Sequence, residues 1–265
     1  MKTILVISDL HINSTVALCK PSVELDDGQE VKISKGQRWL WNNWQDLLSR
    51  ADQARPDILI VNGDAVEGDT KNRSYQIITR NKATALGIAA DILDPLCKIV
   101  GSTYFIRGTG AHSGKSANIE EELAKDMNGV RSKETGAYSH WALNLDVEGV
   151  RINIAHHTTM SGIPWGRKKA AMTLSEWILF DSAQNEELHP HLAIRGHVHR
   201  WADSYDAYPV RSLILPCWSL ATEYVHRISP DALAECGAAI IRVSAGKYEI
   251  EKINYRPKGR VWQKI

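Results

Sequence analysis

The sequence predicts an α/β fold in which a second β-sheet packs on the first. From Lys2 to His199, short apolar runs that end in polar residues alternate with stretches of helical spacing, which is typical of α/β proteins. From Ser212 to Asn254 the chain carries strand-like runs with little helical pattern, which indicates the second sheet. With 265 residues and 43% apolar content the chain can bury a large core. We therefore expect one domain over residues 1–265, with an irregular insertion at residues 21–35.

Five apolar runs are predicted to be strands buried within a sheet. Each is short and ends in Gly, Asp, His or Arg, as expected when a strand is covered on both faces and carries functional groups at its carboxyl end. The first, KTILVISDLH, shows the pattern clearly, because its β-branched and aliphatic residues give way to Asp9 and His11. The five runs span residues 2–11, 56–64, 98–108, 150–157 and 190–199.

Three segments between these strands are predicted to be helices. Residues 34–53 place Trp and Leu at helical spacing, and residues 73–97 have a similar apolar pattern. Residues 116–127, SANIEEELAKDM, begin with a serine that would cap the helix and continue with an acidic first turn. The later runs SLILPCW, CGAAIIRVS and KYEIEKIN, within residues 212–254, are predicted to be strands.

The composition argues against several classes of protein. A formal charge of +1 with 24% charged residues gives no basic excess of the kind found in dedicated nucleic-acid or membrane-surface binders. No run approaches the roughly 18 apolar residues of a membrane-spanning helix, and no secretory signal is evident. The four cysteines are too far apart for CxxC metal sites. We expect a soluble protein of the reducing cytoplasm that does not bind membranes.

Polar residues that follow the five predicted strands form a candidate metal site. Ligands of open α/β sheets bind beyond the carboxyl ends of the strands, so residues that are distant in sequence can converge there. Imidazole with carboxylate suits manganese, iron or zinc better than calcium. Two such ions would clamp a phosphate and lower the pKa of a bound water, giving hydroxide at neutral pH. The candidate residues are Asp9, His11, Asp64, His112, His156, His157, His197 and His199.

Most of these residues lie in motifs that resemble the calcineurin-like metallophosphoesterase superfamily. DLH at 9–11, GDAVE at 63–67, HH at 156–157 and GHVH at 196–199 follow the order of the family's DxH, GDxx[DE], single-histidine and GHxH blocks. The resemblance implies a four-layer α/β/β/α sandwich of two mixed sheets flanked by helices. It also implies two divalent ions, Mn²⁺ before Fe, Zn, Ni or Mg. Asp9, His11 and His199 would hold the first ion, Asp64 would bridge, and His156 and His197 would hold the second.

The remaining family block, GNH[DE], is altered here to RGTGAHSG at residues 107–114. Counting back from His112 puts Ala111 in the Asn position, whereas counting forward from Arg107 puts Thr109 there. We favour the second alignment, because many family members carry Arg before the glycine. By resemblance, Arg107 binds phosphate, Thr109 is a weaker ligand of the second ion, and His112 protonates the leaving oxygen.

Two features of this altered block affect the expected mechanism. Ser113 replaces the acidic residue that orients the histidine in the family, so Glu67 or one of the glutamates at 120–122 would have to substitute. We still expect an active enzyme, because a badly oriented general acid forfeits part of a roughly 10²–10⁴-fold effect rather than the whole acceleration.

Two more residues are expected to face the substrate. Either histidine of the 156–157 pair can be the ligand; we favour His156 and assign His157 to the substrate side. Arg167 opens a predicted helix and can reach phosphate, since guanidinium groups and helix amino termini both favour anions.

The substrate class is less constrained than the ligand set. A looser similarity to metallophosphoesterase-like proteins of phages favours a phosphodiesterase or nuclease, and the partner is then a phosphoester such as a nucleotide or nucleic acid. A phosphomonoesterase or protein phosphatase shares every metal ligand and is the first alternative. A metal- or phosphate-binding module without catalysis is the alternative from another class. The sequence predicts no oligomeric state.

Overall fold

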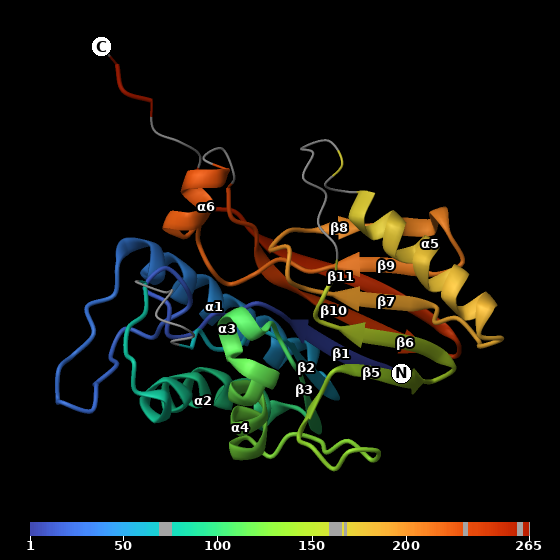
Figure 1. Ribbon diagram of the computed structural model, residues 1–265, viewed down its shortest axis with the longest axis horizontal. Coiled ribbons are helices and arrows are strands. Elements are labelled where there is room, and N and C mark those ends of the chain that lie inside the picture. Colours follow the sequence, from blue (N-terminus) through green and yellow to red (C-terminus); the bar gives the residue numbers. More distant parts are fainter. Residues whose placement is uncertain (69–75, 159–165, 167–168, 230–232, 259–261, 265) are drawn as a thin grey trace.

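Two mixed β-sheets pack face to face in the computed structural model of the chain, and helices cover their outer sides (Figure 1). The structure describes all residues except 69–75, 159–165, 167–168, 230–232, 259–261 and 265. One apolar cluster fills the space between the sheets, with Val6 and Ile241 from the first sheet against Ile154 and Leu213 from the second. The predicted α/β/β/α sandwich is confirmed.

The first sheet has six strands in the order β11-β10-β1-β2-β3-β4. Strands β1 to β4 run parallel, while β10 pairs antiparallel with β1 and β11 antiparallel with β10. The late strands at 236–255 were expected in the second sheet, and that expectation is wrong. Strand β1 is apolar on both faces, and β10 pairs with its free edge, which puts these late strands in the first sheet. The strands are β1 (Lys2–Ile7), β2 (Ile58–Asn62), β3 (Ser102–Ile106), β4 (Ser139–His140), β10 (Cys236–Ser244) and β11 (Lys247–Tyr255).

The second sheet has five strands in the order β5-β6-β7-β9-β8. Its central strands β6, β7 and β9 run parallel, and β5 and β8 flank them antiparallel. The carboxyl ends of its central strands lie on the same side of the molecule as those of β1 and β2, since the predicted ligands from both sheets meet. The strands are β5 (Ala142–Val147), β6 (Val150–Ala155), β7 (Leu192–Arg195), β8 (Ala202–Asp203) and β9 (Arg211–Ile214).

Three helices cover the outer face of the first sheet: α1 (Lys35–Ala54), α2 (Lys82–Ile99) and α4 (Asn118–Asp126). Helix α1 begins at a capping box, in which the backbone N–H of Gln37 donates to the Ser34 hydroxyl and the backbone N–H of Ser34 donates to the side-chain oxygen of Gln37. Its inner face buries Leu40, Trp44 and Leu47. The prediction for this helix, residues 34–53, is confirmed to within one residue at each end.

The other two helices of this layer begin later than expected. Helix α2 starts at Lys82, because the Asn81 side chain accepts hydrogen bonds from the backbone N–H groups of Ala83 and Thr84. Residues 73–75, where the helix was predicted to start, lie outside the described residues. The expected cap at Ser116 is wrong. Ser116 has a left-handed backbone with φ of 62°, and α4 begins at Asn118.

The remaining helices are short or lie on the second sheet. Figure 1 shows α5 (Lys169–Gln184) lying across the outer face of the second sheet, near β9. Within the segment expected to be an insertion, residues 21–35, residues 21–34 form no helix or strand apart from an isolated bridge between Glu24 and Glu30, and residue 35 begins α1. Within the described part of the chain, no helix is both long and apolar enough to span a bilayer. The short elements are α3 (Gly110–Ser113), α6 (Glu223–Ile228) and the 3-10 turns η1 (Lys115–Ala117) and η3 (Tyr205–Ala207).

Candidate metal centre

The loops after β1, β2, β6 and β7 bring the six predicted Asp and His ligands into one cluster. Three groups of ligand atoms form within it, and the atoms of each group lie within 4.8 Å of one another. Because Asp64 belongs to two of the groups, one carboxylate joins both halves of the cluster. The groups are Asp9 with His11 and His199, Asp64 with His156 and His197, and Asp64 with His11 and His112.

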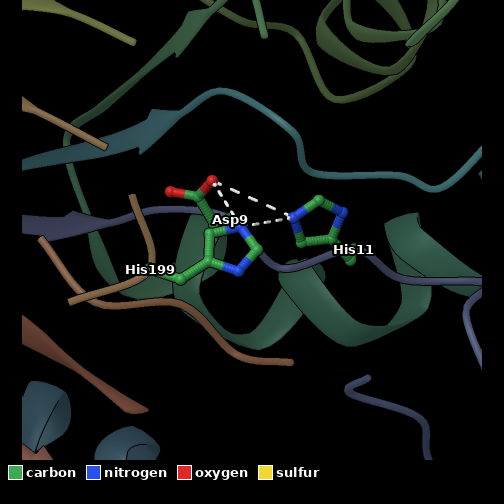
Figure 2. Close-up of side chains that lie close together, drawn as sticks. All are labelled: Asp9, His11 and His199. Carbon is green, nitrogen blue, oxygen red and sulfur yellow. Dashed lines mark hydrogen bonds and ion pairs between the residues drawn. The ribbon is translucent and has the colours of Figure 1, made fainter. Parts of the chain in front are cut away.

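The first group directs one oxygen and two nitrogens toward a common point (Figure 2). Nε2 of His11 lies 3.0 Å from Nε2 of His199, and Oδ1 of Asp9 lies 3.2 Å from the His199 nitrogen and 3.9 Å from the His11 nitrogen. Asp9 and His11 are buried. Two imidazole nitrogens facing each other beside a carboxylate are a donor set that suits a borderline divalent cation.

The second group has a similar composition and similar burial, with two buried residues and one of intermediate exposure. Nε2 of His156 lies 3.1 Å from Oδ2 of Asp64, and its Nδ1 lies 2.7 Å from the main-chain oxygen of Asn62. Donation to that carbonyl fixes the tautomer and leaves Nε2 available to act as a ligand. The His197 ring lies 5.6 Å from the His156 ring, between centroids. His156 also approaches Oδ1 of Asp9, at 3.7 Å, which links the two groups.

Backbone strain marks most of the predicted ligands. A left-handed φ is uncommon outside glycine, and residues held in sparsely populated backbone regions cost about 1–3 kcal/mol each. The strained backbone turns these side chains, which come from separate loops, toward one point, and the surrounding fold keeps the backbone in this conformation. The residues are Asp9 (φ 53°), His11 (46°), Asp64 (46°), His197 (71°) and His199 (55°).

Two glycines are required by the close packing around these side chains. A Cβ at Gly108 would lie 2.1 Å from Oδ1 of Asp64, and one at Gly196 would lie 2.1 Å from Oγ of Ser8 and 2.6 Å from Oδ2 of Asp9. Sequence reasoning did not single out these glycines as part of the site. Their position directly before Thr109 and His197 was the available signal, because a glycine next to a functional residue often permits close backbone approach.

The altered block at residues 107–114 lies against the cluster. The backbone N–H of Thr109 donates to Oδ1 of Asp64 at 2.6 Å, and its hydroxyl lies 3.1 Å from Oδ2. Nδ1 of His112 lies 2.8 Å and 2.9 Å from the two carboxylate oxygens of Glu67. Glu67 is therefore the acid that contacts this histidine, and it also contacts Nδ1 of His11 at 2.9 Å.

The predicted substrate-facing residues occupy different surroundings. The guanidinium of Arg107 is directed to Ser139 at 2.9 Å and Glu121 at 3.3 Å, away from the ligand cluster. His157 is exposed, with its ring 4.4 Å from that of His197, whereas His156 lies inside the second group. Arg167 falls outside the described residues. The roles of all three in substrate binding stay predictions.

A comparison of family signatures decides which family the protein belongs to. Residues 2–201 match the family described as calcineurin-like phosphoesterase, which is well over half of the chain. The chain belongs to the calcineurin-like phosphoesterase family. It is therefore a metal-dependent hydrolase of phosphoester bonds, and a site for two metal ions is typical of its family. A search of curated proteins found no match.

Solved structures that resemble this phosphoesterase are distant in sequence. Vacuolar protein sorting 29 from Cryptosporidium parvum is 12% identical, with a TM-score of 0.43 over 97% of this chain and 98% of that one. A dimetal phosphatase from Danio rerio is 11% identical, with a TM-score of 0.49 over 95% of each chain. A 5'-nucleotidase from Candida albicans is 8% identical, with a TM-score of 0.41 over 95% of this chain and 51% of that one.

The carboxylates of the phosphoesterase site are held ionised. Burial opposes their ionisation, but the charges of His156 and His199 lower the pKa of Asp9 to about 2. The pKa of Asp64 is likewise lowered by His156 despite burial. Hydrogen bonds from His11 and His112 outweigh burial at Glu67 and lower its pKa to about 2. The ionised carboxylates are balanced by imidazoles whose pKa values are raised, so a metal ion that binds here would replace the protons of those imidazoles.

The donor set therefore fits two divalent ions. In the ligand set that the resemblance implies, Asp9, His11 and His199 would hold one ion and His156 and His197 the other, and Asp64 lies where it can contact both groups. When bound, the ions lower the pKa of coordinated water and offset phosphate charge. His112 lies next to this arrangement, with Nδ1 facing the Glu67 carboxylate.

Proposed function

We propose that this phosphoesterase is a phosphodiesterase or nuclease that uses two Mn²⁺ ions. The observation that carries the proposal is the position of Asp64, which shares one ligand group with His156 and His197 and another with His11 and His112. One carboxylate between two sets of imidazoles supports two adjacent ions, and His112 beside it supports a proton donor at the same point. Imidazole and carboxylate donors together support Mn²⁺, Fe or Zn over calcium.

His112 is the proposed donor of the proton to the leaving oxygen. Burial lowers its pKa, but its hydrogen bond to Glu67 and the charges of Asp64, Glu67 and Asp9 raise the pKa to about 9. Because Nδ1 faces the Glu67 carboxylate, Nε2 is the ring atom available to the substrate. A histidine that stays protonated at neutral pH can deliver that proton as the ester bond breaks.

The charge around the cluster favours a diester over a monoester. Arg107 is the residue expected to neutralise phosphate, yet its guanidinium pairs with Glu121 at 3.3 Å, which offsets its charge. A phosphomonoester carries close to two negative charges near neutral pH, with a second pKa of about 6, and a diester carries one. We therefore propose that Arg107 contributes to phosphate binding only in competition with Glu121, which disfavours the dianion.

We also propose that the protein lies in a reducing compartment such as the cytoplasm, and its free thiols support this. All four cysteines are free, and Cys19, Cys217 and Cys236 are buried. Oxidising compartments favour disulfides in place of such thiols.

Hydrolysis of chromogenic esters tests the proposed reaction. The chelator-treated protein should hydrolyse neither bis-p-nitrophenyl phosphate nor p-nitrophenyl phosphate, and Mn²⁺ should restore activity with a kcat/KM at least about tenfold higher for the diester. A preference for the monoester would support the phosphomonoesterase alternative. If the protein binds a single ion per chain and His112→Ala leaves any hydrolytic rate unchanged, it is a binding module instead.

A further inference from the structure

Helix α5 turns its small side chains toward the protein. Its buried residues are Ala170, Ala171 and Ser175. The Ser175 hydroxyl lies 2.8 Å from that of Ser212, so the helix packs closely on β9 of the second sheet. A helix that covers a sheet usually buries its large apolar side chains, as α1 does with Trp44. In α5 this pattern is reversed.

The large apolar side chains of α5 face solvent instead. Trp177 and Phe180 are 64% and 56% exposed, and their rings meet edge to face with centroids 6.3 Å apart. Met172 is also exposed, and at about 100° per residue the three fall within about 140° of the helix circumference. Figure 1 shows α5 as the outermost layer on this side of the molecule. Soluble monomers rarely expose large apolar patches, and Trp, Phe and Met are enriched at protein interfaces.

The charges of α5 are placed against the dipole of the helix. The amino end of a helix favours negative side chains, and the carboxyl end favours positive ones. Lys169 is the first residue of α5, Asp181 lies in its last turn, and Glu186 and Glu187 follow the helix. Among the residues that the structure describes, these four charges form no ion pair. A second helix packed antiparallel would place the positive end of each helix beside the negative end of the other.

We propose that the exposed face of α5 binds the same face of a second copy of this chain, with the two helices antiparallel about a twofold axis. Lys169 and Asp181 are 12 positions apart, which is about 18 Å along the helix. If Lys169 of each copy lies opposite Asp181 of the other, the axis crosses the helix at the level of residue 175. Trp177 is then about 3 Å from the axis along the helix. The two Trp177 rings therefore meet at the centre of the contact, where the residues that contribute most to binding cluster.

A second copy fits this face better than a lipid surface does. Helices that lie on bilayers carry Lys and Arg beside their apolar face, because lipid head groups are often anionic. In α5 two acids, Glu176 and Asp181, adjoin Trp177 and Phe180 in the chain. Asp181 would meet Lys169 in the antiparallel pair. Glu176 accepts a hydrogen bond from the Tyr208 hydroxyl of its own chain, so its carboxylate has a partner that does not depend on the second copy.

Sedimentation velocity over a range of protein concentrations tests this contact. Because α5 has only 16 residues, the interface is small, and we expect a dimer with a Kd of about 1–100 µM. The double variant Trp177→Gln, Phe180→Gln should raise the Kd at least about tenfold. Both side chains are exposed in the single chain, so the variant should fold. Tyr224→Gln, which removes an exposed aromatic side chain from α6, is the matched control and should leave the Kd unchanged.

Exchange of the end charges tests the antiparallel arrangement. Lys169→Glu and Asp181→Lys should each raise the Kd about tenfold, because two attractions per dimer become two repulsions. An equimolar mixture of the two variants should associate as the wild type does, because every end charge then meets its opposite. Both substitutions place charges as the helix dipole prefers, so weaker association would not reflect loss of the helix.

Three results would overturn the proposal. The first is a wild type that stays monomeric throughout the range, including one that binds vesicles of phosphatidylcholine and phosphatidylserine instead. The second is a dimer whose Kd does not change in Trp177→Gln, Phe180→Gln. The third is a mixture of the charge variants that associates no better than either variant alone. Sedimentation does not depend on hydrolysis, so these results are distinguishable from a failure of the proposed function.

Discussion

The two halves of the ligand cluster hold their histidines in different ways. In the half formed by Asp9, His11 and His199, the outer nitrogen of His11 faces the Glu67 carboxylate at 2.9 Å. In the other half, the outer nitrogen of His156 faces the main-chain oxygen of Asn62 at 2.7 Å. Glu67 is a side chain and also contacts His112, whereas the Asn62 oxygen belongs to the backbone of β2 and its second partner is the Ser8 hydroxyl, at 2.8 Å.

On the proposed function, this difference associates proton transfer with the first half and an imidazole held by the backbone with the second. His156 is 1% exposed and is set by the backbone of a central strand, while the His199 side chain is 35% exposed. Thr109, which the favoured alignment puts in the family's Asn position, contacts the Asp64 carboxylate beside His156. We therefore expect substitutions in the first half to change both metal binding and pH dependence, and those in the second half to change metal binding mainly.

The largest expected effect comes from removing the carboxylate that joins the halves. Asp64→Asn keeps the shape of the side chain but removes the charge, so both ions should be lost and kcat for bis-p-nitrophenyl phosphate should fall by at least about 10³-fold, beyond the roughly 10–100-fold of an outer contact. Metal content by mass spectrometry and activity should fall together. Asp52→Asn, on the exposed side of α1, is the matched control. Normal turnover of Asp64→Asn would overturn the assignment of the site.

The next largest effect is expected for Glu67→Gln, which should impair the first half of the cluster and leave the second half in place. The neutral amide of this variant cannot hold His11 and His112 as an anion does, so we expect kcat to fall about 10²-fold and affinity for the first ion to fall by about 10–100-fold. Asn62→Gln cannot serve as the corresponding variant in the second half, because Asn62 contacts His156 through its main-chain oxygen, which the substitution keeps. His156→Asn is the comparison that weakens the second ion with His112 left intact.

The pH profile distinguishes Glu67 as a catalytic partner from Glu67 as a packing residue. A proton donor is lost as pH rises through its pKa, and Glu67 helps to raise the pKa of His112 to about 9 although burial opposes this. Without the carboxylate, the pKa of His112 falls, so the alkaline limb of kcat should move to lower pH in Glu67→Gln. A limb that stays in place in this variant would show that His112 is not the donor.

Sequence patterns were sufficient to find side chains that converge, because each lies at a strand end. The order of DLH, GDAVE, HH and GHVH identified residues that the structure brings within 4.8 Å in groups of three. The same reasoning put residues 236–255 in the wrong sheet, because apolar periodicity tells which face of a strand is buried but not which strand is its neighbour. Pairing between β1 and β10 is a long-range contact that only the folded chain defines.

Side-chain partners were the second part that sequence left open. Glu67 and the glutamates at 120–122 were equal candidates for orienting His112, and spacing along the chain has no bearing on which of them reaches a ring on another loop. The structure gives the contact to Glu67, while Glu120 bonds Ser113 and Glu121 bonds Arg107. The local cap at Ser116 failed because a contact from Arg107 to its carbonyl overrides local preference.

The metal-free protein should lose stability at alkaline pH through the second half. Burial lowers the pKa of His156, but Asp9 and Asp64 raise it to about 10 from an ordinary value near 6.5. A raised pKa stabilises the fold fully below about 6.5, and this stability is lost as pH rises through about 10. We expect the Tm of the metal-free protein to fall between pH 7 and pH 10, by roughly 2–4 °C per kcal/mol lost.

Two variants assign this loss to its source. The pKa of His11 is lowered by burial, so a stabilising contribution from it is lost toward acid pH, and His11→Asn should keep the alkaline fall in Tm. His156→Asn should reduce the fall, with His112 and His199 accounting for what remains, since the pKa of each is also raised. Bound metal requires neutral imidazole, so the loaded protein should show a smaller fall. Equal curves for the two variants would contradict the assignment.

The smallest expected effect is a gain at the position where this chain departs from its family. Thr109→Asn would add an amide oxygen beside Asp64, and Asn is also favoured before a helix such as α3. We expect affinity for the second ion to rise about tenfold in a Mn²⁺ titration, the lower end of what a contact near a metal contributes, with little change at the first ion. Thr109→Val keeps the shape without the hydroxyl and should not gain. If the affinity for the first ion rose instead, Thr109 would act on the first half of the cluster, and the proposed distinction between the halves would be wrong.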